Sequence, residues 1–248
     1  MKLSVVIPAY NEEKRITETL RDVNSYLSKQ DYDYEIVVVV NGSHDRTYDV
    51  VKNLENGEIK KAVAVNLKEG GKGNAVKRGI LDSATGDVIM FMDADNATPI
   101  SEMEKFLPYF KEGYDVVIGS RELNPELVKK PQGFLSHTLG KFSHGLIRFM
   151  LLPGIYDSQT GYKAFSKKAA KDIFQYVTIN RWGFDMEVLK IAMVRGYKIK
   201  EVGVLWTEHG GGHVPLSAYA ESFTDLLKIR MKAMQGDYGK KADLAKAK

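Results

Sequence analysis

The stretch YEIVVVVNGSHDRT, residues 34–47, decides the fold class of this chain. Residues 36–40 are all β-branched and apolar, which is typical of a parallel strand whose two faces are both covered. Asparagine, glycine and serine follow at once and favour a turn. Helical spacing of apolar residues continues over residues 45–54. A buried strand, a polar turn and a helix, in this order, form the repeating unit of an open α/β sheet.

The same unit recurs on both sides of this stretch. LSVVIPAY (3–10) predicts a strand before it, and the apolar spacing over 16–27 predicts a helix between the two strands. Downstream we predict strands at 61–67, 87–95 and 114–121, a helix at 74–84, and another helix starting at a capping-box pattern of Ser101 and Glu104. We therefore expect a Rossmann-like α/β fold, with a mostly parallel sheet and helices on both of its faces.

The second half of the chain is less regular. Residues 122–156 mix proline, glycine and histidine with amphipathic pieces, which predicts loops with one or two helices. Residues 184–206 predict a helix followed by a strand, and residues 219–234 a last helix. Because no repeat or linker is visible, we expect a single domain over residues 1–236 and a flexible, Lys-rich tail over 237–248.

Composition excludes several classes of protein. The chain has 248 residues, 44% of them hydrophobic and 27% charged, as in globular proteins. It has no cysteine, which excludes disulfide frameworks, thiolate catalysis and cysteine-based zinc sites. The net charge of +4 is too small to indicate a nucleic-acid binder, and we expect no nucleic-acid partner. It suits a protein that handles anionic small molecules or contacts an anionic membrane surface.

No segment has the length and composition of a membrane span. The longest apolar neighbourhood, 146–155, is interrupted by Arg148 and Pro153, whereas a spanning helix needs about 20 apolar residues. We expect a cytoplasmic location, with peripheral contact to a membrane as one alternative. Two basic amphipathic segments suit an interfacial helix as well as a helix packed on the domain core, namely 141–156 and 221–234.

Polar residues gather after each of the five predicted strands of the first half, in PAYNEE, NGSHDRT, KEGGKGNA, DADNAT and GSR. Ligands of open α/β sheets bind beyond the carboxyl ends of the strands. Turn chemistry explains any one of these segments, but five in succession indicate a ligand site. The usual nucleotide motifs do not fit, because Gly73 rather than serine or threonine follows Lys72, and no G-x-G-x-x-G follows the first strand.

Asp93 and Asp95 stand at the mouth of the fourth strand, on either side of Ala94. Alternation along a strand would point both carboxylates to the same side. Carboxylates with open neighbouring positions suit Mg²⁺ or Mn²⁺, which commonly share their oxygen ligands with substrate phosphates. A lone D-x-D also occurs as a pair of solvated loop acids, and its place after the apolar VIMFM (88–92) is what favours a metal site.

These motifs together resemble those of a known family. VIPAYNEE, NGSHDRT, GGKGNAVKRG, DADNAT and GSR, in this order and spacing, resemble the GT-A fold family 2 glycosyltransferases. DSQTGYKAF, RWGFDMEVL and VLWTEHGG look like dolichyl- or polyprenyl-phosphate β-glucosyltransferases, with dolichyl-phosphate mannosyltransferases next. The resemblance covers residues 3–210. It implies an inverting, metal-dependent transfer of a sugar, with glucose favoured over mannose, from a UDP- or GDP-linked donor to a lipid phosphate.

The resemblance also implies roles for particular residues. Substrate contacts fall on Pro8, Tyr10 and Glu12 of the first loop, Asp45 of the second, Asp93, Ala94, Gln159, Arg181 and Trp182. Lys72 is a further substrate-binding candidate on the ground of its charge, which suits the phosphates of the donor. Metal binding falls on Asp93 and Asp95, and catalysis on Asp95, Arg121 and Asp185. Asp185 is the best carboxylate for a base or a sugar contact, although an aspartate there could equally cap the helix that follows.

Two positions depart from the family pattern. Many relatives have two aspartates before Gly-Ser, where this chain has Val40 and Asn41, so Asn41 is the candidate contact to the base or ribose and the nucleobase stays open. Mannosyltransferase relatives can use a glutamine two residues after the D-x-D, where this chain has Ala97. The second departure makes a mannose-type metal site less favoured.

The sequence is also compatible with three other functions. A family 2 glycosyltransferase with a saccharide or protein hydroxyl as acceptor would need a general base, whereas a phosphate acceptor is already largely ionised at pH 7. A nucleotidyltransferase also combines an α/β sheet with paired acids. A sugar-nucleotide sensor would bind the donor without turnover.

Overall fold

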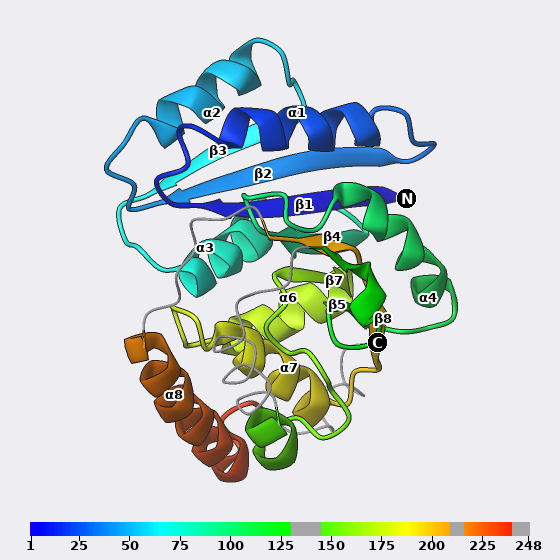
Figure 1. The fold of residues 1–248 in the computed structure, drawn as a ribbon, viewed down its shortest axis with the longest axis vertical. Helices are drawn as coiled ribbons and strands as arrows, with labels where there is room; N and C mark the ends of the chain where they lie inside the picture. Colours follow the sequence, from blue (N-terminus) through cyan, green and yellow to red (C-terminus); the bar gives the residue numbers. More distant parts are fainter. Residues whose placement is uncertain (130–144, 209–215, 240–248) are drawn as a thin grey trace.

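A seven-stranded sheet forms the centre of the structure, a computed structural model that describes residues 1–129, 145–208 and 216–239 (Figure 1). The strands lie in the order β3 (Ala62–Leu67), β2 (Asp33–Asn41), β1 (Lys2–Ala9), β4 (Val88–Met92), β7 (Tyr162–Ser166), β5 (Val116–Ser120) and β8 (Ile199–Gly203). Neighbouring strands are parallel, except that β7 is antiparallel to both β4 and β5. Two short strands, β6 (Val128–Lys129) and β9 (Trp206–Thr207), form a separate parallel pair. The mostly parallel sheet is confirmed.

Alternate residues of the central strands supply two separate cores, one on each face of the sheet. In β2, Val37 and Val39 belong to one hydrophobic cluster, whereas Ile36, Val38 and Val40 belong to the other. Successive side chains of a strand point to opposite faces, so a strand covered on both sides has to be apolar at every position. This requirement explains the unbroken apolar run of residues 36–40.

Helices cover both faces of the sheet (Figure 1). On one face lie α1 (Ile16–Leu27), α2 (Thr47–Asn56), the 3-10 segment η2 (Ile100–Lys105) and α4 (Leu107–Lys111). On the other lie α3 (Lys72–Arg78), its π-helical continuation η1 (Gly79–Ser83), α6 (Lys167–Tyr176) and α7 (Phe184–Arg195), with α8 (Leu216–Gln235) packed against α7. A further 3-10 turn, η3, spans Pro125–Leu127, and residues 145–150 are helical.

Two predictions about helices are corrected by the structure. Ser101 does not cap a helix, because it lies inside η2, which Pro99 precedes without a side-chain cap. The carboxylate of Glu104 accepts a hydrogen bond from the Tyr32 hydroxyl at 2.9 Å instead of closing a capping box. The predicted helix at 74–84 begins at Lys72 and widens at its end into the π turn η1, whose hydrogen bonds join residues five apart.

Strand β7 is absent from the sequence predictions. It has only five residues, YKAFS, and a lysine stands at its second position. A charged residue inside a short apolar run argues against a buried strand, yet Lys163 is completely buried between β4 and β5. Burial is tolerated because its ammonium has two oxygen partners, the Asp185 carboxylate and the carbonyl of Thr160.

The C-terminal part of the described chain is anchored rather than loose. Tyr238 is 1% exposed, its hydroxyl donates to Glu187 Oε1 at 3.0 Å, and its carbonyl accepts from Arg195 Nη1 at 3.1 Å. The tail predicted for residues 237–248 therefore does not begin at 237. The remainder of that prediction, 240–248, lies outside the described residues, as does 130–144 of the loop region. In the part of the chain that is described, no helix combines the length and apolarity of a membrane span.

Candidate active site

The candidate site lies at the edge of the sheet where the parallel strands β1, β2, β3 and β4 end. Because β7 runs the other way, the loop that precedes it, 157–161, reaches the same edge, and Tyr162 pairs with Met92 there. Gly161 lies against Asp93: a Cβ atom on Gly161 would come within 2.0 Å of Asp93 Oδ2. Only glycine fits at this position without displacing the carboxylate.

The loops after β1 and β2 are bonded to each other. Asn11, which adopts a left-handed backbone with φ of 54°, accepts at Oδ1 from His44 N at 2.9 Å. Asp45 accepts at Oδ2 from Glu13 N at 3.1 Å and at Oδ1 from Thr47 N at 3.0 Å. Burial acts to raise the pKa of Asp45, but these hydrogen bonds outweigh it and the pKa is lowered. Asp45 is thus an ionised link between the two loops.

The other candidates of this region differ in exposure. Tyr10 is 51% exposed, with its ring edge-to-face to His44 at 6.3 Å between centroids. Pro8 is buried inside β1. Glu12 is engaged at its carboxylate by Arg15 at 2.8 Å, and its backbone N–H donates to Thr47 Oγ1. Among these three candidates, Tyr10 is therefore the most accessible.

The glycine-rich loop between β3 and α3 is clamped from two sides. In the amide orientation that satisfies both groups, Asn41 donates to Ala9 O at 2.8 Å and accepts from Gly71 N at 3.2 Å. On the other side Gly73 N donates to Asn180 O at 2.9 Å. Gly71 has φ of 122°, and a Cβ atom there would lie 2.5 Å from Asn180 O. Asn41 is 4% exposed, so it holds this loop in place between the strand end and residue 180.

Lys72 extends from the clamped loop to the acidic centre of the site. Its Nζ lies 2.5 Å from Asp93 Oδ1, and its side chain is 20% exposed. Burial acts to lower the pKa of Lys72, but the charges of Asp93 and Asp185 outweigh it and the pKa is raised. Lys72 is therefore a cation that these two carboxylates share.

Asp93, Ala94 and Asp95 lie in a turn and not on the strand, because β4 ends at Met92. The alternation argument for their carboxylates is therefore wrong, although the two groups are close enough to interact. Burial, and secondarily the charge of Asp93, raises the pKa of Asp95, whose Oδ1 accepts from Ala97 N at 3.0 Å. Ala94 itself is buried, and its carbonyl accepts from Thr19 Oγ1 at 2.7 Å.

The donor set of this turn fits Mg²⁺ or Mn²⁺. Both metals prefer carboxylate and phosphate oxygens. No third acid or histidine converges on Asp93 and Asp95 among the described residues, so substrate oxygens and water would have to complete the coordination. The ammonium of Lys72 against Asp93 already demonstrates that the pocket accepts a positive charge.

Asp185 is buried and paired with Lys163. The carboxylate is 4% exposed, and its Oδ1 accepts from Lys163 Nζ at 2.6 Å. Lys163 Nζ also donates to Thr160 O. Burial raises the pKa of Asp185, and the charges of Lys163 and Lys72 only partly offset it. The capping alternative for Asp185 is wrong, since α7 begins at Phe184 with Gly183 at the cap position and no side-chain cap.

Arg121 is held by Asp157. Its Nε donates to Asp157 Oδ2 at 2.7 Å and its Nη2 to Oδ1 at 3.0 Å, a two-pronged geometry. The guanidinium also lies 5.6 Å from the centre of the Trp206 ring. Thr160 Oγ1 donates to the same carboxylate, and so does the backbone N–H of half-buried Gln159, at 3.2 Å. The loop 157–161 thus fixes Arg121 on one side and contacts Asp93 on the other.

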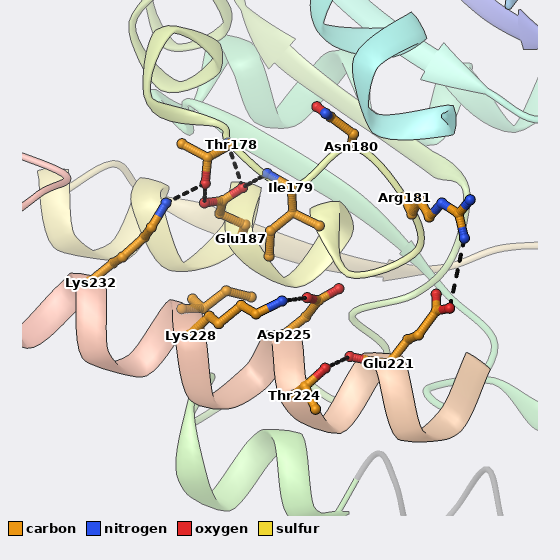
Figure 2. A pocket seen from close by; sticks show the side chains of 11 residues that line it. Thr178, Ile179, Asn180, Arg181, Glu187, Glu221, Thr224, Asp225, Lys228 and Lys232 are labelled. Atoms are coloured by element: carbon orange, nitrogen blue, oxygen red, sulfur yellow. Dashed lines mark hydrogen bonds and ion pairs between the residues drawn. The ribbon is translucent and has the colours of Figure 1, made fainter. Parts of the chain in front are cut away.

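Arg181 and Trp182 lie on the outer rim. Arg181 is 73% exposed at its side chain, with Nη1 3.7 Å from Glu221 Oε1, and Trp182 is 52% exposed. Figure 2 shows Arg181 at one end of a pocket of about 430 Å³ between residues 178–181 and α8. The structure therefore brings together Lys72, Asp93, Asp95 and Asp185, whereas Arg181 and Trp182 lie on an exposed loop and Arg181 faces α8.

Sequence reasoning missed three residues of the site. Asp157, Gly161 and Lys163 all lie within DSQTGYKAF, a segment used only for its resemblance. The sequence did contain a sign that Lys163 matters. A lysine within the apolar run of a strand either lies on an edge strand or has a polar or charged partner. Gly161 and Asp157 offered no comparable signal, since both are common loop residues.

Comparison with known proteins identifies the family. The model of glycosyl transferase family 2 matches residues 4–174. A dolichyl-phosphate beta-glucosyltransferase of Trichomonas vaginalis is 38% identical over 241 residues, covering 92% of this chain and 72% of the relative. The dolichyl-phosphate beta-glucosyltransferase of Homo sapiens is 35% identical over 250 residues, covering 95% and 76%.

Solved structures support the fold. Glucosyl-3-phosphoglycerate synthase from Mycobacterium tuberculosis, in complex with Mn²⁺, UDP and glucosyl-3-phosphoglycerate, matches with a TM-score of 0.66 at 21% identity, over 93% of this chain and 80% of that chain. Mannosyl-3-phosphoglycerate synthase from Rubrobacter xylanophilus matches with a TM-score of 0.70 at 16% identity, over 95% and 75%. With the GT-A fold of these neighbours and relatives above 30% identity over most of its length, the chain belongs to glycosyl transferase family 2.

Proposed function

We propose that this glycosyltransferase moves glucose from a nucleotide-diphosphate glucose to dolichyl or polyprenyl phosphate, with inversion at the anomeric carbon. The observation that carries the proposal is 35–38% identity, over 92–95% of the chain, to proteins named dolichyl-phosphate beta-glucosyltransferase. The cluster of Lys72, Asp93, Asp95 and Asp185 supports it, because open α/β sheets bind their ligands at this edge.

The donor, in this proposal, lies across the ends of β1 and β2. Tyr10 offers an exposed ring for the base. Asn41 acts by holding the glycine-rich loop, and Lys72 stands where it can reach the diphosphate. UDP in the structure of the mycobacterial synthase favours a UDP-linked donor over a GDP-linked one.

Asp93 and Asp95 would hold Mg²⁺ or Mn²⁺ together with oxygens of the diphosphate. When bound, the metal would neutralise negative charge on the departing diphosphate. The chain's own groups position the sugar: Asp185, fixed by Lys163, and Gln159, on the loop that contacts Asp93, supply oxygen and nitrogen partners for its hydroxyls.

A phosphate acceptor depends more on cations that bind and position it than on a general base that removes a proton. A phosphate monoester has a second pKa near 6 and is largely ionised at pH 7. Arg121 presents its remaining N–H groups beside Asp157, and Arg181 is exposed with a long, weak ion pair to Glu221. Either guanidinium suits a phosphate that arrives from the rim of the site.

A lipid acceptor requires contact with a membrane surface, and α8 supplies a suitable face. Its outer side carries apolar residues at helical spacing, namely Phe223, Leu227, Met231 and Met234, which are 46%, 39%, 57% and 79% exposed. Lys228, Arg230 and Lys232 lie among them in the sequence. An apolar stripe beside cations is the composition of a helix that binds anionic headgroups in the interface plane. We propose peripheral binding at the cytoplasmic face of a membrane.

The test is transfer from labelled nucleotide sugars to a short polyprenyl phosphate. We expect UDP-glucose to be the best donor in the presence of Mn²⁺, with a glucosyl lipid phosphate and free UDP as products. Transfer to a saccharide or peptide hydroxyl in place of the lipid phosphate would contradict the acceptor. Release of pyrophosphate would contradict glycosyl transfer altogether.

Asp185→Asn distinguishes the two kinds of acceptor independently. If the nucleophile were a hydroxyl, losing the base would lower kcat by about 10²–10⁴. With an ionised phosphate we expect a smaller loss, and a rate that still rises with acceptor ionisation near pH 6. A rise that disappeared in the Asn variant would make Asp185 the base and exclude a phosphate acceptor.

A further inference from the structure

Lys72 occupies the position that a divalent cation would need in order to reach Asp93. Its Nζ lies 2.5 Å from Asp93 Oδ1, while Asp93 Oδ2 faces the backbone of Gly161. Asp95 also contributes to the negative potential around the ammonium. A carboxylate in direct contact with an ammonium is less available to a metal, because the two cations repel each other.

The backbone that carries Lys72 is fixed, so only its side chain can move. Gly71 accepts no side chain beside Asn180 O, its N–H is bonded to Asn41, and Gly73 N donates to Asn180 O. The four-carbon stem of lysine is flexible and its ammonium is a compact point charge. A nearby phosphate can therefore draw the ammonium away from Asp93 while the loop stays in place.

The protein alone has few ligands to offer a metal. Among the described residues no group of three acids or histidines converges, which leaves Asp93 and Asp95. One Asp93 oxygen is occupied by Lys72, and one Asp95 oxygen accepts from Ala97 N. Mg²⁺ and Mn²⁺ take six or so oxygen ligands, so a metal that meets the free protein finds an incomplete and partly neutralised site.

We propose that Lys72 couples metal binding to nucleotide binding: its ammonium competes with the metal for Asp93 in the free protein, and a bound diphosphate withdraws the ammonium and releases Asp93. The proposal rests on the donor site described above. Coupling of this kind is reciprocal, so the metal must also strengthen nucleotide binding by the same factor. Its function would be to prevent the site from holding a metal when no donor is present.

The experiment is a titration with Mn²⁺, followed by the electron paramagnetic resonance signal of the free ion, with and without UDP. The affinity of UDP for Mn²⁺ in solution is measured separately and subtracted. In the absence of UDP, we expect Lys72→Met to bind Mn²⁺ about tenfold more tightly than the wild type does. The factor by which UDP increases the Mn²⁺ affinity should decrease at least about tenfold in this variant. Both effects lie within the roughly 5–150-fold range that is usual for coupling between two sites.

Two variants serve as matched controls. Lys68→Met removes a positive charge from an exposed position on the same loop, and it should leave Mn²⁺ binding unchanged. Lys72→Arg keeps the charge and should keep metal binding weak in the absence of UDP. Thermal unfolding of each variant establishes that the fold is intact.

The outcomes separate this inference from the proposed function. If the wild-type protein binds neither UDP nor Mn²⁺, the proposed function fails. If it binds both, but Lys72→Met leaves metal affinity without UDP unchanged or weaker, the function stands and the competition between Lys72 and the metal is refuted. An equal effect of Lys68→Met would reduce the result to general electrostatics and would also refute it.

Discussion

Lys163 is a charged residue with no exposure to solvent, and its ammonium links two segments of the candidate site. Its ammonium binds the Asp185 carboxylate and the carbonyl of Thr160. The first partner lies at the start of α7 and the second on the loop that holds Arg121 and contacts Asp93. One side chain therefore connects the start of α7 with the loop 157–161.

Removing this ammonium should leave Asp185 buried without its counter-ion. We expect Lys163→Met to lower the free energy of unfolding by about 3–5 kcal/mol, the usual effect of breaking a buried ion pair on one side. The double variant Lys163→Met with Asp185→Leu should lose less than the sum of the two single variants. Urea denaturation measures all three, and additive losses would mean that the two residues do not stabilise each other.

Asp95 should behave in the opposite way, because it belongs to a crowded pair of acids and has no cationic side chain bonded to it in the described structure. We expect Asp95→Asn to abolish Mn²⁺-dependent transfer while leaving the melting temperature unchanged or higher. The loss of a metal ligand removes activity, and the loss of a repelling charge does not harm the fold. Full activity of this variant in the presence of EDTA would remove Asp95 from the metal site.

Among the elements, the amino ends of β1 and β2 depend on one carboxylate. Glu35 on β2 accepts from Lys2 Nζ at 2.6 Å, Ser4 Oγ at 2.5 Å and Thr85 N at 2.6 Å. Burial acts to raise its pKa, but these bonds outweigh burial and lower the pKa below its ordinary value of 4.5. Because its pKa is lower in the folded than in the unfolded chain, Glu35 stabilises the fold above about pH 4.5 and loses this effect as the pH falls through the folded pKa.

Glu35→Gln should therefore destabilise the protein at neutral pH and much less in acid. We expect a difference of about 1–3 kcal/mol in the free energy of unfolding at pH 7, from bonds to an ionised acceptor, and a steady decrease of that difference below pH 4.5. Glu58→Gln, which breaks the exposed ion pair with Arg21, is the control and should change little at either pH. A difference independent of pH would show that the charge of Glu35 contributes nothing.

The helices and strands also show which parts of the structure could be predicted from the sequence. The parallel strands of the first half were predictable. The clearest case is β2, because a strand buried on both faces must be apolar at every position, as in residues 36–40. Strand β7 was not, since Lys163 is tolerated only through partners elsewhere in the chain. In the same way the strand-end motifs indicated the candidate site, but the pairs Lys72–Asp93 and Arg121–Asp157 are products of tertiary packing that no local pattern encodes.

At the scale of the whole molecule, α8 lies on the outside of the domain and exposes one of its faces to the surroundings. It packs on α7 through Leu226 and Ile229, and it lies far from α1 and α2 in Figure 1. Its outward stripe of Phe223, Leu227 and Met231 is therefore free to meet another surface without disturbing the sheet.

Replacing this stripe should weaken membrane binding and leave chemistry intact. We expect Phe223→Ser, Leu227→Ser and Met231→Ser together to reduce co-flotation with anionic lipid vesicles at least about tenfold, since each exposed apolar side chain loses part of the roughly 1.5–3 kcal/mol of full burial. UDP binding should be unchanged. Val63→Ser, at an exposed position on β3, is the control. Undiminished flotation of the triple variant would assign membrane contact to another face.

The buried Tyr238 has a consequence for how the chain matures on the ribosome. Glu187 is completely buried on α7, and the Tyr238 hydroxyl is one of the donors that satisfy it, together with the backbone and hydroxyl of Thr178. Domains generally fold as units during synthesis. Here the unit remains incomplete until residue 238 has emerged, long after the acidic turn at Asp93 has been made. The sheet is therefore translated early, but the packing of α7 is completed late, and a nascent chain halted before that tyrosine keeps an unfinished core.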